Sequence, residues 1–204
     1  MSFISQPFDQ PILLIDLDGV LADFDAGFKT RWNEHMGALF PAVDVQERCH
    51  FHIADDYPAK YRTDIERLMH APGFYNSLPP IPGAIEAFQR LKAEGYALWI
   101  CSTPPSRNIQ AATEKLAWIE HHLGTFMLER TIFAADKTMI HGDFLVDDRP
   151  TITGSCTPNW EHILFDQPYN RQSPLPRLVW NQEGLMYLIT ALSQCVTNRS
   201  CSRQ

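Results

Sequence analysis

The stretch PILLIDLDGVLADFD, residues 11–25, places four consecutive aliphatic residues directly before four closely spaced acids. The aliphatic run at 12–15 is typical of a strand that is buried on both faces, as strands of parallel sheets are. Asp16 and Asp18 follow this run at a spacing of two residues, and Gly19 allows the backbone to turn tightly after them. Because carboxylates this close repel each other, the rest of the chain must supply a compensating charge.

Strand-like and helix-like segments alternate in the second half of the chain. Strands are expected at residues 96–101, 130–135, 143–148 and 162–166, and helices at 83–95, 111–124 and 183–196. This alternation indicates βαβ units with right-handed crossovers and a parallel sheet. We therefore expect an α/β fold.

Residues 24–80 differ from this regular pattern. They predict a helix at 24–40, an irregular stretch rich in Asp, His and Tyr, and a second helix at 58–70. The motif LPPIPG at 78–83 then interrupts the chain, as Pro/Gly clusters do at junctions. We expect a small inserted domain that ends there.

Composition excludes several classes of protein. The chain has 204 residues, 45% of them hydrophobic, and a net charge of −7, which argues against binding of a nucleic acid polymer. A local cationic site still permits a small phosphate ester as substrate. The N-terminal MSFISQPFDQ lacks the pattern of a signal peptide, and no apolar run is long enough to span a membrane.

The five cysteines are scattered without a CxxC pair, which is typical of a reducing compartment, so the cytoplasm is the expected location. Cys101 lies in an apolar run. We expect it to be a core residue rather than a nucleophile.

Polar residues with a common chemistry follow four of the predicted strands. Asp16 and Asp18 follow the first, Ser102 and Thr103 the second, Lys137 the third, and Asp147 with Asp148 the fourth. Ligands of open parallel sheets bind at these strand ends. Clustered carboxylates with room for water and phosphate suit Mg²⁺. The hydroxyls and the ammonium group suit the oxygens of a phosphoryl group.

These residues also fit a hydrolytic reaction. One carboxylate near a phosphorus atom can attack it and form an aspartyl-phosphate, while a carboxyl two residues on exchanges protons with the leaving oxygen and with water. Each motif alone has a simpler explanation, such as a capped turn, a strand exit, a surface lysine or an exposed ion pair. Their order on successive strand ends favours a phosphate and metal site.

The same residues resemble a known superfamily. DLDGVLAD (16–23), CST (101–103), Lys137 and DD (147–148) match, in order, the four motifs of the haloacid dehalogenase superfamily, in its phosphatase and phosphomutase branch. LPPIPGAIEAF, CSTPP, EKLAWIEHHLG, DKTMIHGDFLVDDRP and NWEHILFDQPYN extend the resemblance to the 5′(3′)-deoxyribonucleotidase family, from about residue 10 to 170.

The resemblance implies a Rossmann-like parallel sheet flanked by helices, with residues 1–23 and 81–204 as the core domain. Residues 24–80 would form a small helical cap between the first two motifs. Asp16 would be the nucleophile and Asp18 the general acid and base. Mg²⁺ would bind the Asp16 side chain, the Asp18 backbone carbonyl and Asp148, with Asp147 in support. The residues that would contact the phosphate are Ser102, Thr103, Lys115 and Lys137.

The cap of this family holds the base with aromatic residues. Phe24 and Phe51 fit that pattern, but His52 stands where a tryptophan is expected. Ala135 stands where relatives can carry an arginine. Both departures put the preference for pyrimidine deoxynucleotides in doubt.

The expected function is Mg²⁺-dependent hydrolysis of a nucleoside monophosphate, with no polymer or membrane partner and with a homodimer left open. Two alternatives remain. One is a phosphatase of the same superfamily acting on another small monoester, and the other is a binding domain that keeps the motifs without turnover.

Overall fold

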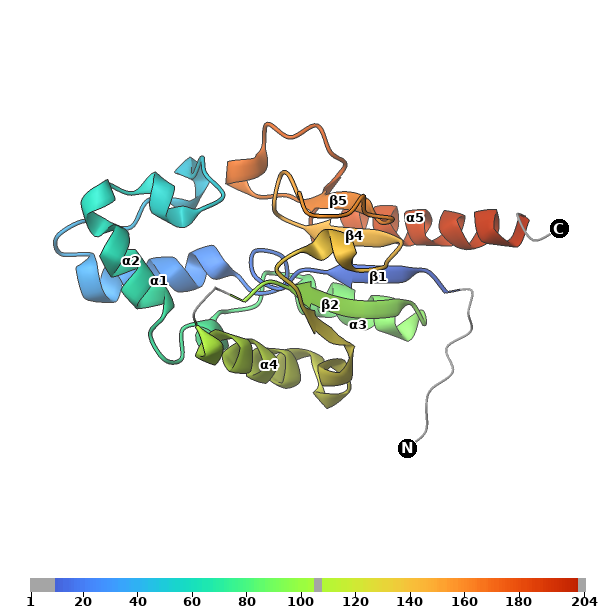
Figure 1. The fold of residues 1–204 in the computed structure, drawn as a ribbon, viewed down its shortest axis with the longest axis horizontal. Helices are drawn as coiled ribbons and strands as arrows, with labels where there is room; N and C mark the ends of the chain where they lie inside the picture. Colours follow the sequence, from blue (N-terminus) through green and yellow to red (C-terminus); the bar gives the residue numbers. More distant parts are fainter. Residues whose placement is uncertain (1–9, 105–107, 202–204) are drawn as a thin grey trace.

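The core of the computed structural model is a six-stranded sheet in the order β3-β2-β1-β4-β5-β6 (Figure 1). The structure describes residues 10–104 and 108–201. The strands are β1 (Ile12–Ile15), β2 (Ala97–Ser102), β3 (Thr131–Phe133), β4 (Phe144–Asp147), β5 (Glu161–Phe165) and β6 (Arg177–Leu178). All five neighbouring pairs are parallel, which confirms the predicted α/β class.

The central strand β1 is buried on both faces, as its aliphatic run predicts. Leu13, Leu14 and Ile15 have no exposed surface. Leu13 and Ile15 belong to the larger hydrophobic cluster, whereas Leu14 packs with Cys101, Leu145 and Trp160 on the other side. Side chains alternate across a strand, so these two clusters lie on opposite faces of the sheet.

Three long helices supply the larger cluster. They are α3 (Ala84–Ala93), α4 (Ile109–Leu123) and α5 (Gln182–Cys201). Their buried hydrophobic residues, such as Phe88, Trp118 and Leu188, belong to the cluster that contains Leu13. The crossovers from β3 to β4 and from β4 to β5, all of whose residues are described, contain no α-helix, only the short helix η6 (Lys137–Met139) and loops. Trp160, which directly precedes β5, covers the face of Leu14 instead.

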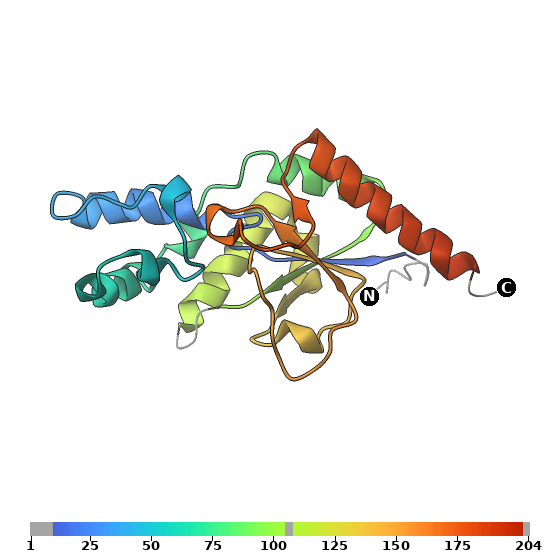
Figure 2. The same ribbon diagram turned by 90° about the horizontal axis from the view of Figure 1, so that it is seen from above.

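The segment 24–80 lies at one end of the molecule, beside the sheet (Figures 1 and 2). It contains α1 (Phe24–Met36), α2 (Arg62–Met69) and the short helices η1 (Val45–Glu47), η2 (Ile53–Asp56), η3 (Ala59–Tyr61) and η4 (Tyr75–Ser77). Both regular helices are shorter than predicted. After α1 the chain folds back, and the Trp32 indole donates a hydrogen bond of 2.8 Å to the carbonyl of Phe40. Pro58 precedes the short helix η3, so that the α-helix begins only at Arg62.

The two passages between this segment and the sheet run side by side. Ala22 and Pro80 form an antiparallel bridge, Asp23 N donates to the Pro79 carbonyl at 2.7 Å, and Ile81 N donates to the Leu21 carbonyl at 2.8 Å. Buried residues of α1 belong to the same hydrophobic cluster as the sheet. The division into a core domain and a cap stays a prediction.

Two short helices complete the structure, η5 (Thr125–Arg130) before β3 and η7 (Pro168–Asn170) after β5. Among the described residues, no helix combines the length and the apolar character that crossing a membrane requires.

Candidate active site

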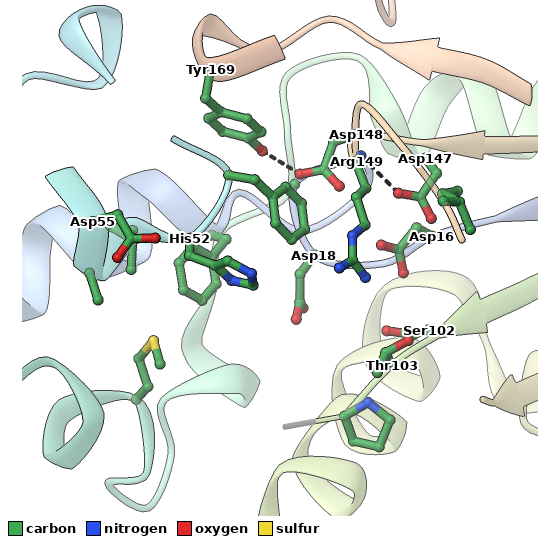
Figure 3. A pocket seen from close by; sticks show the side chains of 18 of the residues that line it. Asp16, Asp18, His52, Asp55, Ser102, Thr103, Asp147, Asp148, Arg149 and Tyr169 are labelled. Atoms are coloured by element: carbon green, nitrogen blue, oxygen red, sulfur yellow. Dashed lines mark hydrogen bonds between the residues drawn. The ribbon is translucent and has the colours of Figure 1, made fainter. Parts of the chain in front are cut away.

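The register of the sheet brings the predicted site residues to one edge. Ile15 pairs with Ile100 of β2 and with Val146 of β4. The residues that follow these three in the chain therefore lie at the same edge of the sheet. Asp16 N donates to the Val146 carbonyl at 2.9 Å. Asp16, Ser102, Asp147 and Asp148 thereby gather in one pocket (Figure 3).

Three of the predicted carboxylates form a cluster. One carboxylate oxygen each from Asp16, Asp147 and Asp148 lies within 4.8 Å of the others, and no other such group occurs among the described residues. Burial raises the pKa of Asp148 well above its usual value, and the charges of Asp147 and Asp16 raise it further. A divalent cation would offset this repulsion, and oxygen-only ligands suit Mg²⁺. The side chain of Asp18 lies outside the cluster.

Lys137 is the cation of this cluster. Its Nζ lies 3.0 Å from Asp16 Oδ1 and 2.5 Å from Asp147 Oδ2, and the side chain is buried. Burial opposes its charge, but the two carboxylates dominate and raise the pKa of Lys137. The ammonium group therefore stays charged beside Asp16.

Lys115 forms a second centre with Asp18. Its Nζ lies 2.8 Å from Asp18 Oδ2, and it donates to Ser102 Oγ and to the Thr103 carbonyl, each at 3.1 Å. The hydroxyl of Thr103 donates to the Ala134 carbonyl at 2.6 Å. Lys115 comes from the middle of α4 and has an exposed fraction of only 1%, so it is a buried residue of the site and not a surface lysine.

Two carboxylate oxygens of the pocket are buried without a hydrogen bond among the described residues, Asp16 Oδ1 and Asp18 Oδ1. Asp16 Oδ1 has only its ionic contact with Lys137. Burial also raises the pKa of Asp18, while Lys115 counteracts that effect. Buried polar atoms without a partner are costly, so the Oδ1 atom of Asp18 indicates a bound group.

Gly19 permits the acids to come this close. It has a φ of +75°, and a Cβ atom there would lie 2.3 Å from Asp148 Oδ2. Only glycine fits both the left-handed backbone and the approach of the Asp148 carboxylate.

The pocket extends from the carboxylates to the segment 24–80 and has a volume of about 830 Å³. All three residues predicted for the base pocket, Phe24, Phe51 and His52, line it. His52 is exposed, while Phe51 packs edge-on against Tyr169, with ring centroids 6.0 Å apart. Ala135 also lines the pocket.

The pocket residues that sequence reasoning missed include Arg48, Arg149 and Tyr169. Arg48 is buried, pairs with Asp25 and Asp56, and donates to the carbonyls of His50 and Phe51 at 2.7 and 3.0 Å. It thereby fixes the backbone that carries Phe51 and His52. Its partner Asp25 is 23 positions away in the chain. No periodic pattern in the sequence could have revealed this pair. Buried arginines are unusual, but burial is not visible in the sequence.

Cys101 is a core residue, as predicted. It has no exposed surface, and burial raises the pKa of its thiol to about 11. The thiolate nucleophile is therefore scarce at neutral pH.

Comparison with known proteins gives consistent results. The model of the family described as 5′ nucleotidase, deoxy (pyrimidine), cytosolic type C protein matches residues 10–191. A Bordetella pertussis protein named "Putative 5′(3′)-deoxyribonucleotidase" is 46% identical over 170 residues, which are 83% of this chain and 91% of that protein. The human cytosolic-type 5′(3′)-deoxyribonucleotidase is 39% identical over 174 residues, with 80% of this chain and 84% of that protein covered.

Solved structures agree on the fold. A haloacid dehalogenase family hydrolase from Deinococcus radiodurans, solved with bound phosphate and sodium, has a TM-score of 0.57 at 15% identity and covers 92% of this chain and 96% of its own. A haloacid dehalogenase-like protein from Agrobacterium tumefaciens has a TM-score of 0.55 at 13% identity, covering 90% of this chain and 99% of its own.

Proposed function

This chain belongs to the cytosolic type C family of deoxy (pyrimidine) 5′-nucleotidases, and from that membership we propose that it hydrolyses 5′- and 3′-deoxyribonucleoside monophosphates with Mg²⁺ as cofactor. The chain is a phosphoric monoester hydrolase of the 5′-nucleotidase type with a haloacid dehalogenase fold. One observation carries the proposal. Asp16, Asp18 and Lys137 line a single pocket beside a cluster of carboxylates, and each acid has a lysine partner, Lys137 for Asp16 and the buried Lys115 for Asp18.

The acidic cluster fits a divalent cation. The Asp16 and Asp148 side chains and the Asp18 backbone carbonyl would hold Mg²⁺, with Asp147 in support through its contact with Lys137. When bound, the ion supplies positive charge that neutralises phosphate oxygens and lowers the repulsion among the acids.

Asp16 is the proposed nucleophile. A bond forms between an Asp16 carboxylate oxygen and phosphorus as the ester bond to the nucleoside breaks. The ion pair with Lys137, at 3.0 Å, holds this carboxylate in place. The residues that would contact the phosphate oxygens are Ser102, Thr103, Lys115 and Lys137. Three of them line the pocket, and Lys115 donates hydrogen bonds to Ser102 and Thr103.

Asp18 is the proposed general acid and base. It gives a proton to the leaving nucleoside oxygen and then takes one from the water that attacks the aspartyl-phosphate. Inorganic phosphate leaves and Asp16 is restored. The buried, unpartnered Oδ1 of Asp18 and its contact with Lys115 support a separate role from Asp16.

The segment 24–80 would act as a cap that holds the base. Phe24 and Phe51 offer aromatic faces for stacking, and His52 offers a smaller, polar ring at the pocket wall. A cytoplasmic location is part of this proposal, supported by the cytosolic-type human relative and by the free cysteines at positions 49, 101 and 156.

The test is phosphate release from a panel of substrates with Mg²⁺. Purine and pyrimidine nucleoside 5′- and 3′-monophosphates, in ribo and deoxy forms, are compared with sugar phosphates and with p-nitrophenyl phosphate. We expect the highest kcat/KM among deoxyribonucleotides and no turnover by Asp16→Asn. Higher kcat/KM for sugar phosphates would favour the small-ester alternative, and no release from any ester would favour a silent binding domain.

A further inference from the structure

The phenol of Tyr169 joins the acidic cluster to the segment 24–80. Its hydroxyl donates a hydrogen bond to Asp148 Oδ2 (Figure 3). The other side of the same ring contacts residues of the segment 24–80. The guanidinium of Arg48 lies 4.4 Å from the ring centroid, and the Phe51 ring packs edge-on at 6.0 Å.

The Asp148 carboxylate is held by a neutral hydroxyl, whereas the carboxylates of Asp16 and Asp147 are held by a lysine. Lys137 lies within 3.0 Å of both Asp16 and Asp147. Among the described residues, the hydrogen bond to the Asp148 carboxylate comes from Tyr169, and no ion pair reaches that carboxylate. The bond to Oδ2 fixes the rotamer of Asp148 and leaves Oδ1 free for an ion.

The turn that carries Tyr169 is braced on both sides. Asn170 Nδ2 donates to the carbonyls of Asp148 and Phe165, each at 2.8 Å. Gln167 Nε2 donates to the Gly19 carbonyl at 2.7 Å, and Arg177 donates to Asn170 Oδ1 at 2.8 Å. The phenol is therefore held at a defined place relative to both Asp148 and the turn after Asp18.

The contacts with the segment 24–80 go beyond the ring itself. Arg48 is buried and also donates to the carbonyls of His50 and Phe51, so the Arg48–Tyr169 contact fixes the loop of the base pocket. At the rim, Arg171 donates to Gln46 Oε1 at 2.7 Å. Movement of the loop 48–52 would therefore displace the Tyr169 ring.

We propose that Tyr169 is a positioning residue that holds Asp148 ready for the metal and makes metal affinity depend on the loop 48–52. This inference rests on the proposed function, because it takes Asp148 as a metal ligand. A partner that orients a ligand carboxylate typically contributes a factor of about 10 to 100 in metal affinity.

The first experiment measures Mn²⁺ binding to the metal-free protein by electron paramagnetic resonance of the free ion. Mn²⁺ accepts the same oxygen ligands as Mg²⁺. Tyr169→Phe keeps the ring and removes only the hydroxyl, and we expect its Kd for Mn²⁺ to rise by about 10- to 100-fold. Thermal unfolding of the same variant checks that the fold is kept. Tyr96→Phe is the matched control, because it removes a phenol that contacts Ser193, outside the pocket.

The outcomes separate the inference from the proposed function. If Asp148→Asn binds Mn²⁺ as tightly as wild type, the proposed metal site is wrong. If Asp148→Asn loses binding while Tyr169→Phe and Tyr96→Phe both bind as wild type does, the proposed metal site stands and the role of Tyr169 is overturned.

A second experiment tests the dependence on the loop. Phe51→Leu removes the edge-on ring contact without touching Asp148. We expect it to weaken Mn²⁺ binding severalfold in the wild-type background and to have no effect in the Tyr169→Phe background, where the hydroxyl is absent. Equal effects in both backgrounds, or no effect in either, would refute the coupling. Gln46→Ala breaks only the rim contact with Arg171 and serves as the control, for which no change is expected.

Discussion

At the scale of single residues, Asp16 and Asp18 have different surroundings although they are two positions apart. Asp16 lies in the acidic cluster with Lys137, whereas Asp18 faces Lys115 and the second strand end. Two titratable groups in different environments can divide a reaction between them. This division would let one short motif supply both the proposed nucleophile and the proposed proton carrier.

Asp18→Asn should cripple turnover while keeping metal affinity, because the backbone carbonyl of residue 18 is unchanged. Loss of proton transfer typically costs a factor of about 10² to 10⁴ in rate. The loss should be smaller with p-nitrophenyl phosphate, whose leaving group needs no proton. Single-turnover rates of the first step for both substrates check this. Equal losses for good and poor leaving groups would contradict the acid role.

His52→Trp should change base preference. A larger ring stacks more strongly on a base, and base–aromatic stacking contributes about 1–3 kcal/mol. We expect the ratio of kcat/KM between pyrimidine and purine deoxynucleotides to shift severalfold from the wild-type value. Since His52 is exposed, it can also be a solvated residue without contact to the base. An unchanged ratio in an equally active variant would assign base recognition to Phe24 and Phe51 alone.

At the scale of elements, loops and helix starts position the site. Gly83 begins α3 with a φ of +81°, and a Cβ atom there would lie 2.3 Å from the Trp180 carbonyl oxygen. Asp136 organises the loop before Lys137. Its carboxylate accepts hydrogen bonds from the backbone and hydroxyl of both Thr138 and Ser155.

Gly83→Ala should destabilise the fold more than Gly95→Ala. Gly95 has a similar φ of +86°, but a Cβ atom there would have no described atom within 4 Å, so alanine costs only the backbone strain, about 1–2 kcal/mol. At Gly83 the clash with a backbone carbonyl adds about 1–3 kcal/mol. Urea unfolding of both variants measures the difference. Equal free energies of unfolding would show that the contact with Trp180 relaxes without cost.

Asp136→Asn should reveal a pH-dependent contribution to stability. Hydrogen bonds from Ser155 and Thr138 lower the pKa of Asp136 in the folded chain. Such a carboxylate stabilises the fold above its unfolded pKa, about 3.9, and the stabilisation is lost as the pH falls toward the folded pKa. The gap in urea midpoint between wild type and Asp136→Asn should therefore be widest above about pH 5 and narrow in acid. A gap that is constant with pH would contradict this account.

The sequence predicts the regular elements well and the tertiary contacts poorly. Strands β1, β2, β4 and β5 and helices α3 and α4 start and end within two residues of their predicted limits, because their apolar periodicity is strong. The two-residue strand β6 gives no such signal, since only its pairing with β5 defines it. The motif acids and lysines could be predicted from their order at strand ends and from the family resemblance. Arg48 and Tyr169 could not, because they act through contacts between distant parts of the chain.

At the scale of the whole molecule, one pocket joins two parts with different tasks. The sheet edge supplies carboxylates and a lysine, and the segment 24–80 supplies walls that mix apolar, aromatic and charged residues. The net charge of −7 does not exclude an anionic substrate at this place, because Lys115 and Lys137 offset part of the acids' charge and a bound divalent cation would offset more. The chain enters and leaves the segment 24–80 through two neighbouring stretches of backbone, which pair at Ala22 and Pro80.

The central claim is that Asp16 becomes phosphorylated during turnover. The most direct test is to mix the enzyme with a deoxyribonucleoside monophosphate and Mg²⁺, quench with borohydride, and map the peptides by mass spectrometry. Borohydride reduces an acyl phosphate to the alcohol, so a phosphorylated aspartate appears as homoserine. We predict homoserine at position 16, only with substrate present, and none in Asp16→Asn. Reduction at Asp18 instead, or turnover without reduction at any aspartate, would contradict the account.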